Sequence, residues 1–85
     1  MALKLPRRVA ARPEPAQWHD DELMTFVEAA ALLWPTGPLT ASSLRTAYRA
    51  GQLQVTVIAR KLLVTKAAIR AMTAAASRPP RGKDR

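Results

Sequence analysis

The sequence contains no cysteine and a single histidine, His19. Disulfide bonds and cysteine-ligated zinc are therefore excluded as means of stabilising a small core. No apolar run approaches the ~20 residues that a membrane-spanning helix needs, and the basic start of the chain lacks the apolar stretch of a signal peptide. With one imidazole and no clustered His/Asp/Glu set, we expect no enzyme activity, no cofactor and no metal site. The composition is typical of a cytoplasmic protein.

Acidic residues are absent from residues 29 to 83, although that stretch holds nine lysines and arginines. The whole chain carries a formal charge of +8. A surface of one sign favours a polyanionic partner, and counterion release from nucleic acid is the commonest source of affinity for such a surface. We therefore expect double-stranded DNA as the partner. A membrane is not expected, because the chain has predicted strands and few aromatic anchors.

The composition divides the chain into three parts. Residues 1–22 are basic and interrupted by prolines, which predicts a flexible, extended N-terminal arm. Residues 77–85 are again basic and broken by prolines, which predicts a disordered tail. Residues 23–76 lie between them and are long enough for one small domain whose core is marginal in size.

Capping signals predict two helices in the first half of that domain. Thr25 and Glu28 have the spacing of a capping box, so a helix should run from residue 26 to about residue 33. Thr40 caps the second helix, and Gly51 is the expected left-handed stop at its end. The prolines and glycine of residues 34–39 separate the two helices.

After Gly51 the apolar period changes from helical spacing to alternation. Residues 52–57 alternate between apolar and polar side chains, and residues 62–65 form a second β-favouring run. The three residues 59–61 then form the turn of a hairpin. Thr65 caps a closing helix, whose core-facing residues are predicted to be Ala68, Ile69, Met72 and Ala76.

The order helix, turn, helix, hairpin, helix predicts a winged helix-turn-helix, a mainly α fold with a small β-hairpin. The second helix would enter the major groove, where arginine forks onto guanine edges or phosphates and hydroxyls contact phosphates. The hairpin would form a wing on the neighbouring backbone or minor groove. The predicted DNA-binding residues are Ser42, Ser43, Arg45, Thr46, Arg49, Arg60 and Lys61.

Some of these residues have a second explanation. Ser42 and Ser43 favour the first turn of a helix whatever they contact. Arg45 and Arg49 can also be read as solvated charges on an exposed helix face. Tyr48, which has helical spacing with the predicted core residues, is interpreted as a core residue rather than a phosphate ligand.

The chain resembles the excisionase-like winged helix-turn-helix domains, which are relatives of the DNA-binding domain of MerR-type regulators. The resemblance covers about residues 24–76 and depends on the pairing of two motifs, Glu28-Ala-Ala-Ala-Leu-Leu33 and Leu44-Arg-Thr-Ala-Tyr-Arg-Ala-Gly-Gln-Leu53. Two features depart from the family pattern: the turn at residues 34–39 is longer, and the tip at residues 59–61 has neither glycine nor asparagine.

The resemblance implies the role of an excisionase, or recombination directionality factor. Several copies would bind adjacent sites, bend attachment-site DNA and direct an integrase toward excision of a mobile element or prophage. A small transcriptional regulator of the same fold is the alternative, and a packaging or partition adaptor is a third possibility. We expect self-association on DNA, with the acidic patch of residues 20–22 in one copy contacting the wing or closing helix of the next.

Overall fold

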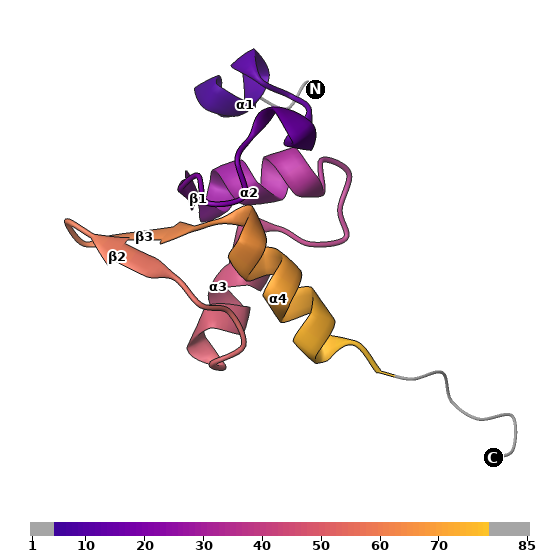
Figure 1. The fold of residues 1–85 in the computed structure, drawn as a ribbon, viewed down its shortest axis with the longest axis vertical. Helices are drawn as coiled ribbons and strands as arrows, with labels where there is room; N and C mark the ends of the chain where they lie inside the picture. The colour runs from indigo at the N-terminus through magenta and orange to yellow at the C-terminus, as the bar shows by residue number, and fades with distance from the viewer. Residues whose placement is uncertain (1–4, 79–85) are drawn as a thin grey trace, which may run out of the picture.

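The computed structural model describes residues 5–78, over which the chain forms four α-helices, a short 3₁₀-helix and a three-stranded antiparallel sheet (Figure 1). This is a mixed α/β arrangement rather than a mainly α fold with a hairpin. The predicted order of helix, helix, hairpin and helix is present, preceded by three elements that the sequence did not predict. In chain order the elements are α1 (Arg7–Ala11), η1 (Pro15–Gln17), β1 (Met24–Thr25), α2 (Phe26–Leu33), α3 (Ala41–Arg49), β2 (Thr56–Ile58), β3 (Lys61–Val64) and α4 (Lys66–Ala76).

Helices α2 and α4 begin where their capping residues predicted. The Thr25 Oγ1 atom accepts a hydrogen bond from the Glu28 amide at 3.1 Å, and Glu28 Oε1 accepts one from the Thr25 amide at 2.9 Å. The capping box therefore satisfies two amides that the first turn of a helix leaves unpaired. Thr65 caps α4 in the same way, because its hydroxyl accepts from the Ala68 amide at 3.1 Å.

Helix α3 has a defined start and a defined stop. Thr40 and Ser43 form its capping box, with 3.3 Å from the Ser43 amide to Thr40 Oγ1. At the other end Gly51 has φ +79°, and the next amide, that of Gln52, donates back to the Ala47 carbonyl at 2.9 Å. This is a Schellman closure, which needs a residue in the left-handed region and so favours glycine there. The predicted bounds of α3 are confirmed.

The sheet has the strand order β1-β3-β2. Strand β1, which precedes α2 directly, pairs Met24 with Val64 of β3. Strand β2 pairs with the other edge of β3, and the Ile58–Lys61 pair closes the hairpin. The hairpin is shorter than predicted, because Gln52 is used to close α3 and residues 52–55 lead from the helix to the strand. Lys61 lies in β3, not in the turn.

The tip of the hairpin is a two-residue turn made of Ala59 and Arg60. Their φ angles are +52° and +68°. Positive φ at both central residues is the geometry of the tight hairpin turns that match the twist of the strands, and asparagine or glycine normally occupies such positions. An L-residue with a Cβ pays ~1–2 kcal/mol for a left-handed conformation. The wing tip is therefore a strained turn.

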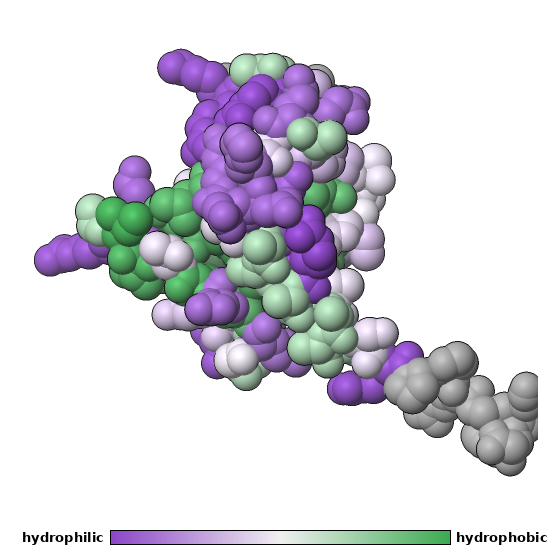
Figure 2. Space-filling model, in the orientation of Figure 1, coloured by the Kyte–Doolittle hydropathy of each residue, from purple (hydrophilic) through white to green (hydrophobic). Residues whose placement is uncertain are grey.

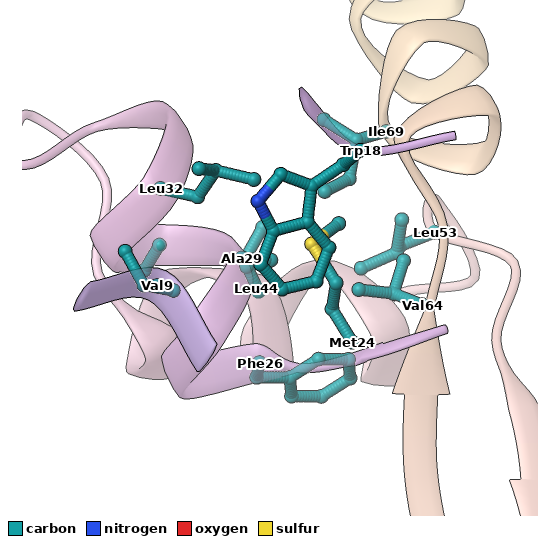
Figure 3. Close-up of a cluster of buried hydrophobic side chains, with 11 residues drawn as sticks. Val9, Trp18, Met24, Phe26, Ala29, Leu32, Leu44, Leu53, Val64 and Ile69 are labelled. Atoms are coloured by element: carbon teal, nitrogen blue, oxygen red, sulfur yellow. The ribbon is translucent and has the colours of Figure 1, made fainter. Parts of the chain in front are cut away.

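The hydrophobic core lies where α2, α3, β1, β3 and α4 meet (Figure 3). The side chains of Met24 and Leu44 are fully buried, and Val64 and Ile69 are nearly so. Ala76, which was predicted to face this core, is exposed. It lies in the last turn of α4, beyond the reach of the packed elements.

The N-terminal segment is part of the core, which corrects the prediction of an extended arm. Val9 in α1 is 2% exposed and Trp18, directly after η1, is 3% exposed (Figure 3). The Trp18 indole nitrogen donates to the Arg12 carbonyl at 2.8 Å, so the buried ring has no unpaired polar atom. Burial of a large aromatic ring and an aliphatic side chain offsets the entropy of ordering these residues.

The same segment is tied to the start of α4. Lys66 Nζ donates to the Pro15 carbonyl at 2.7 Å, and the Ala67 amide donates to the Asp20 carbonyl at 3.1 Å. The folded unit therefore begins well before residue 23, the predicted boundary. Residues 1–4 of the predicted arm and residues 79–85 of the predicted tail lie outside the described part of the chain.

Candidate nucleic-acid interface

Helix α3 carries five of the predicted DNA-binding residues, and four of them are exposed. Leu44, Ala47 and Tyr48 face the core. Because successive residues are rotated by ~100° in an α-helix, Ser42 and Arg49 fall opposite this core face.

Ser43 and Thr46 lie on the flank of α3 that faces α4. They line a groove of about 530 Å³, whose other side includes Met72 and Ala76. Ser43 is half-buried, and its hydroxyl accepts from the Thr40 amide at 3.2 Å. Its structural role as a capping residue thus accounts for its position. Of the seven predicted residues, Ser43 is the one whose side chain is committed elsewhere.

The hairpin projects from the body of the molecule, with its tip free of other elements (Figure 1). Arg60 and Lys61 are exposed at this tip. Next to them on β2, Val57 is 57% and Ile58 is 50% exposed. Figure 2 shows the result, an apolar surface along the hairpin that ends in hydrophilic side chains. The wing therefore presents both cations and aliphatic groups.

Three of the predicted residues come together around one hollow. Arg45 of α3 and the two hairpin cations, Arg60 and Lys61, line a space of about 420 Å³ beside the start of α2. The Arg45 guanidinium lies over the Phe26 ring, 6.0 Å from its centroid. This is a cation–π geometry, in which the face of the ring attracts the charge. The contact joins α3 to the first residue of α2.

The cations of the N-terminal segment are neutralised within the chain. Arg12 donates to Glu22 Oε1 at 3.0 Å, and Arg8 reaches both Glu22 and Glu28 at 3.2 Å. Both guanidinium groups also lie over the Trp18 ring, at 4.9 Å for Arg8 and 4.1 Å for Arg12. These arginines hold the N-terminal segment on α2. They are positioned for structure, so the basic composition of this segment does not create a DNA-binding arm from them.

A second ion-pair cluster joins the acidic patch to α4. Arg70 Nη2 lies 3.1 Å from Asp20 Oδ1, and Lys66 Nζ lies 3.7 Å from the same oxygen. With Glu22 paired to Arg8 and Arg12, two of the three carboxylates in residues 20–22 are already engaged within the chain. The expected contact of this patch with a neighbouring copy is therefore corrected. The acidic patch contacts the closing helix of its own chain.

These contacts favour the charged forms of the carboxylates. The pKa of Glu22 is lowered from 4.5 to about 2, chiefly by the hydrogen bond from Arg12, although partial burial opposes the shift. The pKa of Asp20 is lowered as well, mainly by the hydrogen bond from Arg70. Both carboxylates stay ionised across the physiological range and keep their partners engaged.

The remaining basic residues form no ion pair within residues 5–78. They are Arg7, Arg45, Arg49, Arg60, Lys61 and Arg78. Four of these six belong to α3 and the hairpin. The structure thus sorts the positive charge into neutralised cations on the N-terminal segment and α4, and available cations on α3 and the wing.

Sequence reasoning missed the N-terminal network and the role of Phe26. One signal was present: Arg8 and Arg12 precede the chain's main cluster of carboxylates, so segments of opposite charge follow each other closely. The position of Trp18 beside that cluster was a second signal. Nothing in the sequence pattern places Arg45 over Phe26, because the two residues lie on different helices.

Within the described range no group of three or more His, Cys, Asp or Glu residues could hold a metal ion. In the same range no helix has both the length and the apolar character to cross a membrane. No family model, no curated protein and no solved structure matches the chain. The candidate site therefore rests on the geometry and charge described above.

Proposed function

We propose that this chain is a sequence-specific binder of double-stranded DNA with a winged helix-turn-helix architecture. In this proposal α3 is the recognition helix and the β2–β3 hairpin is the wing. The observation that carries the proposal is the sorting of charge. Arg45, Arg49, Arg60 and Lys61 have no carboxylate partner in residues 5–78, whereas Arg8, Arg12, Lys66 and Arg70 do. Unpaired cations on adjacent projecting elements suit phosphates, which repay their exposure by counterion release.

The architectural role of an excisionase is the particular function that we propose. In this role, several copies bind neighbouring sites on attachment-site DNA, bend it and assist an integrase in excision. Bending a short site costs ~1–6 kcal/mol, so a small protein needs neighbouring copies to share that cost. The exposed aliphatic surface of the wing at Val57 and Ile58 supports this role, since apolar side chains beside phosphate-binding cations suit contact with a widened or bent minor groove. A transcriptional regulator with the same fold is the second candidate.

A matched pair of variants tests the proposed interface. Arg49 and Arg70 are both exposed arginines on helices, but Arg70 is paired with Asp20 and Arg49 has no partner among residues 5–78. We expect Arg49→Ala to weaken binding to a duplex selected from a random library, and Arg70→Ala to change it little. Fluorescence anisotropy at fixed salt measures both. Equal losses would mean that intramolecular pairing does not locate the interface.

The recognition helix is tested by the double variant Arg45→Ala, Arg49→Ala. If this variant binds the selected duplex as the wild-type protein does, α3 is not the recognition helix. The choice between excisionase and regulator depends on the DNA itself. Energy transfer between the labelled ends of a duplex measures bending, and an unbent complex with a single copy per duplex would exclude the architectural role.

A further inference from the structure

The hollow between the wing and the two helices has an unusual lining. Its residues are Thr25, Phe26, Val27, Arg45, Arg60, Lys61 and Leu62. Three of these residues are cationic and three are apolar, and no carboxylate is among them. The three cations come from two separate elements, α3 and the hairpin, that pack on either side of the start of α2. Without a counter-charge in the hollow, these like charges repel one another, and an anion placed between them relieves that repulsion.

The direction of the Arg45 side chain determines what this residue can contact. Arg45 lies on the flank of α3 nearest to α2, and its guanidinium is over the Phe26 ring. That ring is 4% exposed and fixed in the core, so it is a rigid platform. A guanidinium stacked on an aromatic face keeps its N–H donors in the plane of the group, where they can fork onto phosphate oxygens. Arg45 therefore faces the wing rather than the outermost surface of α3.

From this geometry we infer that the hollow is a clamp for one backbone phosphodiester of DNA. Arg45 and the two wing cations hold the phosphate from both sides. The aliphatic wall formed by Val27 and Leu62 takes the adjoining deoxyribose. The inference rests on the proposed DNA-binding function and assigns Arg45 a role that differs from the base-reading role expected for a recognition helix.

The clamp separates two tasks along α3. Arg45 fixes the position of the protein on the backbone, which carries no sequence information by itself. Base reading then falls to the face of α3 directed away from the core, where Arg49 and Ser42 are exposed. Arginine forks onto the O6 and N7 atoms of guanine, so Arg49 is the residue that we assign to sequence discrimination.

The test measures affinity for two duplexes over a range of salt. One duplex is selected from a random library with the wild-type protein, and the other is a shuffled duplex of the same length and composition. Arg45→Ala should weaken binding to both by the same factor and flatten the slope of log K against log salt by about 0.9. That slope change makes the loss at 50 mM salt about 3.5-fold larger than the loss at 200 mM. Arg49→Ala should instead reduce the ratio between the two duplexes.

Two controls accompany the test. Arg7→Ala removes an equally exposed, unpaired arginine on α1, outside the hollow, and should leave both affinities near those of the wild type. Arg45→Lys keeps the charge but loses the planar fork, so it should retain the salt slope while weakening both complexes equally.

The outcomes separate the inference from the proposed function. A change in the ratio between the two duplexes on Arg45→Ala would show that Arg45 reads a base, and unchanged affinities would show that it contacts nothing. Either result overturns the clamp while DNA binding stands. A wild-type protein that binds neither duplex would refute DNA binding and the clamp with it.

Discussion

The strained tip of the wing leads to a prediction in which stability and DNA binding change in opposite directions. Arg60 has φ +68°, a backbone conformation that glycine adopts freely. Relief of the left-handed strain is worth ~1–2 kcal/mol, and the added freedom of glycine in the unfolded chain removes ~0.4–1 kcal/mol of that gain. Arg60→Gly should therefore raise the free energy of unfolding by about 0.5–1 kcal/mol.

This gain should be measurable in a protein of 85 residues. For domains of this size 1 kcal/mol shifts Tm by ~4–8 °C, so we expect a rise of roughly 2–8 °C, followed by circular dichroism. The hairpin strand β3 pairs with β1 and contributes the buried Val64, so strain at the tip acts on the global transition. Arg60→Ala keeps the strain and provides the reference.

DNA binding should respond to the charge at residue 60 and not to its backbone. Arg60→Gly and Arg60→Ala should lose the same affinity, for selected and shuffled duplexes alike, because each removes one phosphate contact. Ala59→Gly is the matched control, since Ala59 has φ +52° and carries no charge. It should stabilise the protein and leave DNA binding unchanged.

Two results would refute this reasoning. If Arg60→Gly unfolds at a lower urea concentration than Arg60→Ala, the turn is not left-handed in solution. If Arg60→Gly binds DNA as tightly as the wild type, the wing tip is not part of the interface. The expected combination, a more stable protein that binds less well, would indicate that the strain is retained for function.

Three further predictions concern the rest of the molecule. Trp18→Ala should lower the free energy of unfolding by ~3–5 kcal/mol in urea titrations, because the ring is 3% exposed; an extended arm would give almost no change. Since the pKa of Glu22 falls from 4.5 to about 2 on folding, its stabilising effect is complete above pH 4.5 and is lost as the pH falls toward 2, so Glu22→Gln should flatten the dependence of Tm on pH in that window. Analytical ultracentrifugation should show a monomer in free solution and more than one copy on a long duplex at saturation, whereas one copy per duplex would contradict the architectural role.

The helices that were predicted correctly are those whose boundaries depend on local chemistry. Thr25, Thr40 and Thr65 each pair with an amide three residues away, and Gly51 accommodates a left-handed stop. Such signals involve neighbours in the sequence, so a pattern can reveal them. The cations of α3 and the wing were found for a related reason, because exposure follows directly from helical period and from a place in a turn.

The parts that were not predicted depend on contacts between distant residues. Strand β1 has two residues, which is too short for any period, and it exists because β3 offers a free edge. The arm prediction failed because prolines and charges in residues 1–22 resemble a disordered composition. The burial of Trp18 and the engagement of Arg12 with Glu22 become visible only once the segment is folded on α2.

The attachment of the N-terminal segment to α4 has a consequence for when the protein can fold. Lys66 and the Pro15 carbonyl that it binds are separated by 51 residues. At a synthesis rate of ~5–20 residues per second, the partner of Pro15 is made about 3–10 s after Pro15 itself. Throughout that interval Val9 and Trp18 have no completed core to enter, so the first residues to leave the ribosome are among the last to reach their final contacts. A nascent chain of this protein should therefore stay sensitive to proteases until translation passes α4, and then become resistant in a single late step.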